Sequence, residues 1–141
     1  MKKRSEHGFS IIEVLVVCAI IGIIAALAIP FLQKAIRAAE NGTTFATMRS
    51  MSSTEMSFYS QNSRWGRLTE INNIMSNAIG TPYGNQVTRG KFIFSMSPDP
   101  SPTDADLKNG FEITATRNVT GEGVVYVYRL DQSGEIRQVL P

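Results

Sequence analysis

Residues 8–30 read GFSIIEVLVVCAIIGIIAALAIP, and this stretch decides how the rest of the chain is organised. From Val14 to Ile29 it holds no charged and no strongly polar side chain, and from Phe9 to the residue before Pro30 it is 21 residues long. A helix rises about 1.5 Å per residue, so this length spans roughly 30 Å, the thickness of the hydrocarbon core of a bilayer. The sequence therefore predicts a helix that can cross a membrane.

The residues before the apolar stretch indicate its orientation. Lys2, Lys3 and Arg4 place positive charge on its amino side, which favours a cytoplasmic amino terminus and an outward-facing carboxyl-terminal domain. Hydropathy alone leaves two ordinary alternatives open. One is a secretory signal, because residues 26–28, Ala-Leu-Ala, fit the small-x-small cleavage pattern, and the other is a signal anchor that stays in the membrane.

Glu13 is the one charged residue between Phe9 and Ile29. A carboxylate at the centre of a bilayer costs about 2.5–3.5 kcal/mol, so an acid inside a membrane span indicates a function. A position at the level of the lipid headgroups, where the cost is small, is the plain alternative. The neighbouring residues favour a function, because Gly8 and an aromatic residue stand directly before Ser-Ile-Ile-Glu.

Residues 8–13 resemble the signature of type IV pilins and of the pseudopilins of type II secretion. That signature is a short charged leader ending in glycine, then Phe-Ser/Thr-x-x-Glu, then an apolar helix. The resemblance implies that a membrane-embedded prepilin peptidase cuts between Gly8 and Phe9 and methylates the new amine on Phe9. It further implies that Glu13 meets the terminal amine of the adjacent subunit during assembly and sets the axial register. Within one chain Glu13 can also approach its own amine, because residues four apart share a helix face.

Gly22 and Pro30 also stand where pilins of this group carry a helix-weakening glycine and a proline. Proline removes a backbone hydrogen bond from a helix, and glycine lowers helix propensity by about 1 kcal/mol relative to alanine. We expect a kink near Pro30. By the resemblance, residues 22–30 can lose their helical form in a filament, while the simpler alternative is a bend where the helix leaves the bilayer.

Beyond Pro30 the pattern changes to that of an amphipathic helix that ends between Ser60 and Gly66 and packs on a sheet. A short second helix is predicted from a cap at Thr69 to Gly80, followed by a loop over residues 81–90. The apolar positions predicted to face the core are Ile36, Phe45, Met48, Met51, Phe58 and Tyr59. Alternating apolar residues predict strands at 91–96, 111–116, 124–130 and 135–140.

These elements predict an α+β fold in which a long N-terminal helix, its apolar half protruding or embedded in a membrane, packs on a small antiparallel sheet of three or four strands. This is the pilin architecture. The expected division is a leader at 1–8, an apolar transmembrane or filament-core helix at 9–30, its amphipathic half at 31–62, and a globular domain with a connector loop and sheet at 63–141.

The composition argues against catalysis. Without residues 1–8 the chain has eleven basic and eleven acidic side chains, and the one histidine, His7, is lost with the leader. Cys18, the one cysteine, lies inside the apolar stretch, so no intrachain disulfide forms. No nucleophile can be paired with a histidine base, and we expect no enzyme, no cofactor and no metal site.

Two polar groups are weighed as further sites. Asp99, Asp104 and Asp106 carry hard oxygen ligands, but their spacing matches no calcium motif, and solvated loop acids are the preferred interpretation. Basic residues beside aromatic ones leave DNA open as a partner without favouring it over a solvated rim. The residues concerned are Arg64, Arg67, Trp65, Arg89, Lys91 and Phe92.

The resemblance implies a structural subunit of a type IV pilus, a helical homo-oligomer used in adhesion, twitching motility or DNA uptake. Its partners are the prepilin peptidase, an inner-membrane platform protein and an assembly ATPase. The precursor is expected in a bacterial inner membrane and the product in an extracellular pilus. The chain lacks the carboxyl-terminal cysteine pair of many type IVa pilins, so a periplasmic type II secretion pseudopilin stays as the first alternative. A secreted binding domain with an ordinary signal peptide is the second.

Overall fold

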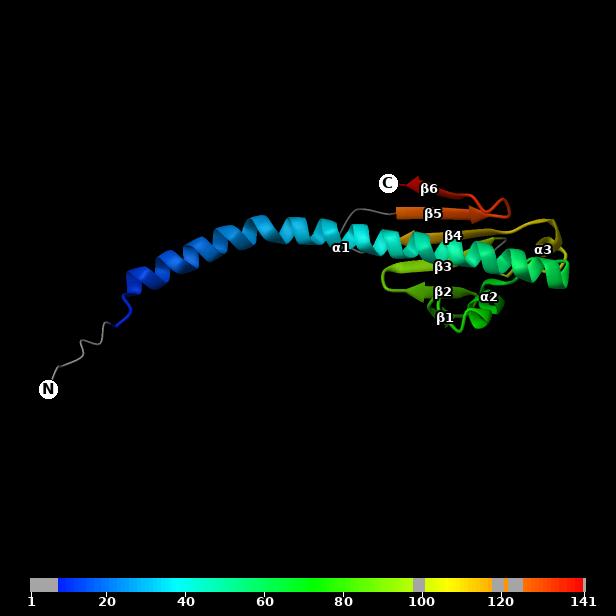
Figure 1. Cartoon of the computed structure of the whole chain (residues 1–141), viewed down its shortest axis with the longest axis horizontal. Helices are drawn as coiled ribbons and strands as arrows, with labels where there is room; N and C mark the ends of the chain where they lie inside the picture. Colours follow the sequence, from blue (N-terminus) through cyan, green and yellow to red (C-terminus); the bar gives the residue numbers. More distant parts are fainter. Residues whose placement is uncertain (1–7, 98–100, 118–120, 122–125, 141) are drawn as a thin grey trace. The chain divides into compact units, whose positions relative to one another are not determined.

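A computed structural model of the chain describes residues 8–97, 101–117, 121 and 126–140. The leader residues 1–7, Asp99 and the first two residues of the predicted strand 124–130 lie outside these ranges. The chain divides into two structural units, Met1–Glu40 and Asn41–Pro141. Its elements are α1 Ile11–Asn62, α2 Leu68–Ile74, β1 Thr81–Tyr83, β2 Gln86–Arg89, β3 Phe92–Ser97, α3 Asp106–Asn109, β4 Glu112–Arg117, β5 Tyr126–Asp131 and β6 Ile136–Leu140 (Figure 1).

The first unit contains the apolar part of α1. The helix passes Gly22 and runs through Pro30 without a break. Proline in a helix interior costs about 3 kcal/mol because it removes a hydrogen bond and crowds the preceding turn. In Figure 1 this part of the helix, drawn in blue, is a continuous ribbon that curves gradually. The backbone thus accommodates Pro30 within the helix, and no segment between residues 22 and 30 has lost helical form.

The second unit contains one antiparallel sheet of six strands in the order β1-β2-β3-β4-β5-β6. Every strand pairs with the next one along the chain, so the sheet is a simple meander. The predicted class, a long helix with an antiparallel sheet, is confirmed, and the four strands expected from alternation correspond to β3, β4, β5 and β6. The sheet has more strands than the three or four predicted.

The two additional strands, β1 and β2, lie where a loop was predicted over residues 81–90, and that prediction is wrong. Tyr83 pairs with Gln86, so Gly84 and Asn85 form a two-residue hairpin turn. Gly84 has φ +59°, the left-handed conformation that such a turn requires at its first position. The Gly-Asn pair was the available signal, but three- and four-residue strands are too short to show an alternating pattern.

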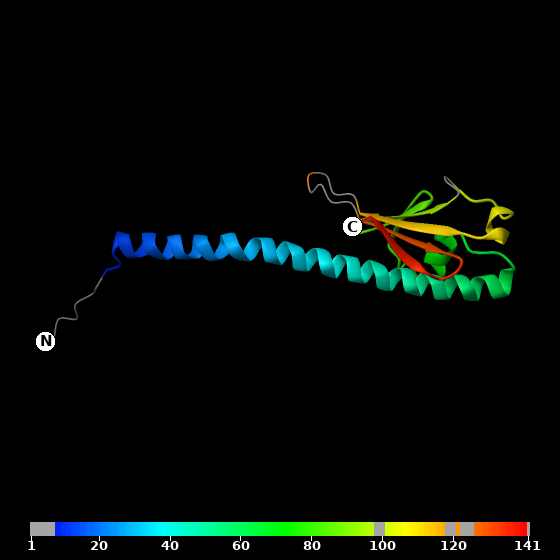
Figure 2. The ribbon, with the colours of Figure 1, turned by 90° about the horizontal axis from the view of Figure 1, so that it is seen from above.

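From Asn41 onward α1 lies against one face of the sheet, as the edge-on view in Figure 2 shows. Met48 and Met51 are fully buried there, as predicted, while Phe45 and Phe58 are half-buried. Tyr59 and Ile36 are 41% and 46% exposed, so their assignment to the core was wrong. The apolar residues buried in the second unit are Met48, Met51, Leu68, Ile71, Ile79, Val87, Phe92, Phe94, Met96, Leu107, Phe111, Ile113, Ala115, Tyr128 and Leu130.

The short helix α2 differs from its prediction at both ends. It begins at Leu68 after Arg67, not after a cap at Thr69, and the carboxylate of Glu70 accepts the backbone N–H of Arg67 at 2.8 Å. It ends at Ile74 instead of reaching Gly80 because the buried amide of Asn72 organises the following turn. The Asn72 side chain donates to Asn77 and Gly80 and accepts from the N–H groups of Ile79 and Gly80.

Candidate functional site

The start of α1 is fixed by a capping arrangement between Ser10 and Glu13. The carboxylate Oε2 of Glu13 accepts the backbone N–H of Ser10 at 2.9 Å, and the N–H of Glu13 donates to the Ser10 carbonyl at 3.1 Å. A Ser-x-x-Glu sequence is the pattern of a helix capping box, so this contact was readable from the chain and was missed. The cap ends the helix at this point, and Gly8 and Phe9 lie ahead of it, exposed.

The residues singled out at the amino terminus share one side of the helix. Phe9, Ile12, Glu13, Val16 and Val17 line a shallow hollow of about 340 Å³ on the surface of the first unit. The hollow is almost entirely apolar, and the Glu13 carboxylate is its charged group. The structure therefore places Phe9 and Glu13 together on a surface that a second apolar helix or lipid can cover.

The apolar stretch of α1 makes no buried contacts. Every valine, leucine, isoleucine and phenylalanine from Phe9 to Leu32 is at least 48% exposed. The helix contains an 18-residue stretch long and apolar enough to cross a membrane, and none of that stretch is buried. Soluble proteins rarely leave so large a continuous apolar surface in water. A surface of this kind is suited to contact with lipid or with another apolar protein surface.

Gly8 and Gly22 have no packing role among the described atoms. A Cβ built on either residue has nothing within 4 Å. Neither residue has the left-handed backbone conformation that favours glycine. The geometry of the described residues therefore does not explain the glycine at these two positions.

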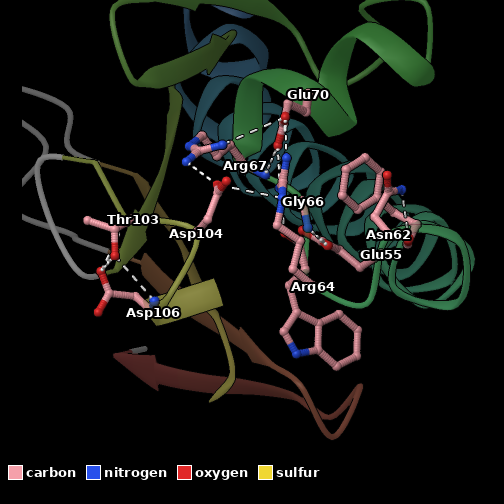
Figure 3. Close-up of polar contacts among 11 residues, drawn as sticks. Glu55, Asn62, Arg64, Gly66, Arg67, Glu70, Thr103, Asp104 and Asp106 are labelled. Atoms are coloured by element: carbon pink, nitrogen blue, oxygen red, sulfur yellow. Dashed lines mark hydrogen bonds and ion pairs between the residues drawn. The ribbon is translucent and has the colours of Figure 1, made fainter. Parts of the chain in front are cut away.

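Glu55 is a polar site that the sequence prediction missed. Its side chain, from the second unit's part of α1, is fully buried, and its Oε2 accepts the backbone N–H of Gly66 at 2.7 Å (Figure 3). The other oxygen, Oε1, has no hydrogen-bond partner among the described residues. Burial raises the pKa of Glu55 to about 8, the Gly66 N–H opposes that rise, and the negative charge of Glu70 adds to it. The carboxyl group is therefore mostly neutral at pH 7.

The basic residues considered for DNA are bonded to carboxylates or to the chain itself. Arg64 forms a two-bond contact with Glu70, Nη1 to Oε2 at 2.9 Å and Nη2 to Oε1 at 2.8 Å, and Arg67 pairs with Asp104 (Figure 3). The Arg64 contact lowers the pKa of Glu70 to about 2. Arg89 donates to the Thr47 hydroxyl and to the Ala78 carbonyl. The carboxylate partners of Arg64 and Arg67 offset the positive charge of these two residues, whereas the acceptors of Arg89 are neutral.

The loop acids are engaged locally. Asp106 accepts the backbone N–H and the hydroxyl of Thr103, which lowers the pKa of Asp106, and Asp104 faces Arg67 and Arg64. In the ranges the structure describes, no group of three or more histidine, cysteine, aspartate or glutamate side chains is placed to hold a metal ion. These acids stabilise the loop that precedes α3.

The comparison with protein families adds one finding. The amino-terminal segment matches the family model described as the prokaryotic N-terminal methylation motif over residues 3–29. This range contains Lys3, Arg4, Gly8, Phe9, Glu13 and Gly22, and it ends one residue before Pro30. No solved structure matches the chain.

Proposed function

The chain carries at its amino terminus the signature of the type IV pilin and pseudopilin family, and from this premise we propose that it is a structural subunit of a type IV pilus. The observation that carries the proposal is the wholly exposed apolar stretch of α1, which follows directly on the methylation motif. Lipid covers this surface in the precursor. The same stretch of neighbouring subunits covers it in the filament.

In this proposal the prepilin peptidase cuts between Gly8 and Phe9 and methylates the new amine on Phe9. Two features of the structure support the position of the cut. Both residues are exposed ahead of the capped helix, and the glycine has no packing role among the described atoms, so recognition by an outside partner accounts for it. Cleavage leaves an ammonium group beside an apolar surface.

A positive charge in apolar surroundings needs a negative partner. Glu13 lines the same hollow as Phe9 and is the only acidic residue in the first turn of α1. We assign it to the terminal amine of the adjacent subunit, a contact that sets the axial register of the filament.

The proposed partners follow from this route. The precursor inserts in a bacterial inner membrane, a platform protein and an assembly ATPase extract it, and copies of the chain form a helical filament outside the cell. The filament serves adhesion, twitching motility or DNA uptake. Of these, DNA uptake has the least support, because Arg64 and Arg67 are already paired with carboxylates within the chain.

A pseudopilin of a type II secretion system is the second candidate. The observation that favours it is the single cysteine, Cys18, which leaves the chain without the carboxyl-terminal disulfide of many type IVa pilins. The two candidates differ in the location of the filament, which extends from the cell surface for a pilin and stays in the periplasm for a pseudopilin. Overproduction yields long surface fibres if the chain is a pilin, whereas cells with intact secretion and no surface fibres favour the pseudopilin.

The amino terminus of the mature protein tests the proposal most directly. We expect intact mass and amino-terminal sequencing to show a chain that begins at Phe9 and carries one methyl group on its amine. A chain that begins at Ile29 would identify an ordinary signal peptide and a secreted domain. An uncut chain would identify a signal anchor, and either outcome would reject the filament proposal.

A further inference from the structure

Residues 63–67 join α1 to α2, and backbone hydrogen bonds, ring contacts and the ion pairs of Arg64 and Arg67 hold them in place. The Gly66 N–H donates to Glu55, and the Trp65 N–H donates to the Leu107 carbonyl at 2.9 Å. The Trp65 ring lies 4.5 Å from the ring of Tyr59 and 5.0 Å from that of Phe111, measured between ring centroids. This connecting segment therefore links the end of α1 to the chain around α3 and β4.

The backbone at the start of the connecting segment supplies little stability of its own. Ser63 has φ +54°, a left-handed conformation that a residue with a side chain adopts only when surrounding contacts hold it. Gly66 is packed so closely that a Cβ there would lie 2.5 Å from the Ile71 side chain. The docked position of the segment thus depends on the contacts at Trp65 and Gly66 together with the ion pairs that Arg64 and Arg67 form with Glu70 and Asp104.

The Glu55 carboxyl group is the buried end of one of these contacts. A neutral carboxyl group accepts the Gly66 N–H and leaves one oxygen without a hydrogen bond, which costs far less free energy than burying a charge. An ionised carboxylate in the same place would keep a full charge away from water with a single hydrogen bond, which is strongly unfavourable.

No free cation compensates that charge among the described residues. The charged groups that face Glu55 are Arg64 from the connecting segment and Glu70 from α2. Glu70 already holds Arg64 through two hydrogen bonds, and Asp104 lies 3.6 Å from the Nε atom of Arg64. Arg67, three residues further along the chain, is itself paired with Asp104 and Glu70. Arg64 can form an ion pair with Glu55 only if it breaks its two hydrogen bonds to Glu70.

We propose that Glu55 and Gly66 form a proton-operated clasp, in which neutral Glu55 keeps residues 63–67 docked and loss of its proton to solvent releases them. Release lets the carboxylate reach water and exposes the Trp65 ring. The two states differ in the connecting segment and in the pairs that Arg64 and Arg67 form with Glu70 and Asp104, while among the described residues Gly66 is the hydrogen-bond partner of Glu55. The clasp is independent of how the amino terminus is processed.

Trp65 is the only tryptophan of the chain and reports on its own segment. The full-length protein in detergent micelles is titrated from pH 6 to pH 9 while tryptophan emission is recorded. We expect the emission to move to longer wavelength with a midpoint near pH 8, as Trp65 becomes exposed to water. Emission that stays constant through this range would overturn the proposal.

Two variants test whether Glu55, and not another titratable group, causes the change in Trp65 emission. Glu55→Gln keeps the acceptor for the Gly66 N–H but cannot ionise, so its emission should stay at the docked wavelength throughout. Glu135→Gln changes an exposed glutamate paired with Arg137, and it should titrate as the wild type does. A shift that persists in Glu55→Gln would show that another group controls the segment.

Infrared spectroscopy detects whether a carboxyl group is protonated. It uses the wild-type protein and so does not depend on the folding of a variant. At pH 7 the wild-type protein should show the carbonyl absorption of a protonated carboxyl group, and at pH 9 this band should be lost in step with the change in Trp65 emission. A spectrum with no protonated carboxyl group at pH 7 would contradict the clasp.

Discussion

Glu13 combines two roles that a single substitution can separate. In the structure its carboxylate caps α1 through the Ser10 N–H, and in the proposed filament its charge neutralises a terminal amine. A cap of this kind is worth about 0.5–2 kcal/mol and needs only an acceptor atom, whereas neutralising an amine needs the negative charge.

We predict that Glu13→Ala and Glu13→Gln both leave membrane insertion intact and reduce the yield of assembled fibres by at least tenfold. The reason is that neither side chain carries the charge, although glutamine retains an acceptor for the cap. Fractionation of membranes and of sheared fibres, followed by immunoblotting, gives the two quantities. If Glu13→Gln assembles like the wild type while Glu13→Ala does not, the cap and not the charge is what assembly requires.

Glu55 predicts how the stability of the second unit depends on pH. Its folded-state pKa of about 8 lies above the ordinary value of 4.5, so the folded protein holds the proton more tightly than the unfolded chain does. The contribution to stability is fully present below pH 4.5, is lost progressively between pH 4.5 and pH 8, and is constant above pH 8. The slope across that window is about 1.4 kcal/mol per pH unit.

We predict that Glu55→Gln removes this slope, because glutamine cannot ionise in either state. Urea unfolding of the full-length protein in detergent, followed by Trp65 emission at several pH values between 5 and 8, measures the free energy of unfolding. The difference between Glu55→Gln and wild type should grow in favour of the variant as the pH rises. Equal slopes in the two proteins would mean that Glu55 is not buried in the folded state.

At the scale of the element, α1 is a helix that contains its own weak point. Gly22 and Pro30 are both helical in the structure, although glycine costs about 1 kcal/mol relative to alanine and proline about 3 kcal/mol. These two residues lower the stability of the helix between residues 22 and 30, so contacts made by an extended form of this segment can favour unwinding. This is the physical basis for proposing that residues 22–30 extend in a stretched filament.

We predict that Gly22→Ala yields fibres that need more force to extend, because alanine adds about 1 kcal/mol of helix stability and its Cβ meets no described atom within 4 Å. Force–extension measurements on single fibres test this. Gly42→Ala is the matched control, since Gly42 also lies in α1 with open space around it but outside residues 22–30. Identical extension curves for Gly22→Ala and wild type would argue against a local helix-to-coil change.

At the scale of the whole molecule, the apolar surface and the apolar core belong to different units. Among the described residues, the buried apolar side chains all come after Asn41, whereas the exposed stretch from Phe9 to Leu32 lies in the first unit. The second unit therefore has a core of its own, and the first unit has none. Each full burial of a large apolar side chain contributes about 1.5–3 kcal/mol, so the stability of the molecule is concentrated after Asn41.

We predict that residues 41–141 expressed alone are soluble, monomeric and folded, with a cooperative unfolding transition. Removal of the exposed apolar stretch takes away the surface that needs lipid or a neighbour, and it leaves the core intact. Size-exclusion chromatography and thermal unfolding followed by circular dichroism test both parts. A fragment that aggregates or melts without cooperativity would show that the first unit is needed for the fold.

The sequence by itself determined the features that depend on neighbouring residues. Gly8, Phe9 and Glu13 lie within six residues of one another, so their order alone carries the methylation motif that the family comparison confirms. The membrane-spanning length of α1 follows from composition and helical rise. The strands β3 and β4 follow from alternation, because every second residue of each is buried and the residues between are half-buried or exposed.

Only the tertiary structure decided the features that depend on distant residues. Glu55 stands in a run of serine, threonine and methionine that reads as a solvated helix face, and it is buried because residues 63–67 fold back over it. Arg64 and Arg67 read as free basic residues until Glu70 and Asp104 are placed beside them. Burial and charge pairing depend on which segments meet in space, and local pattern does not encode that.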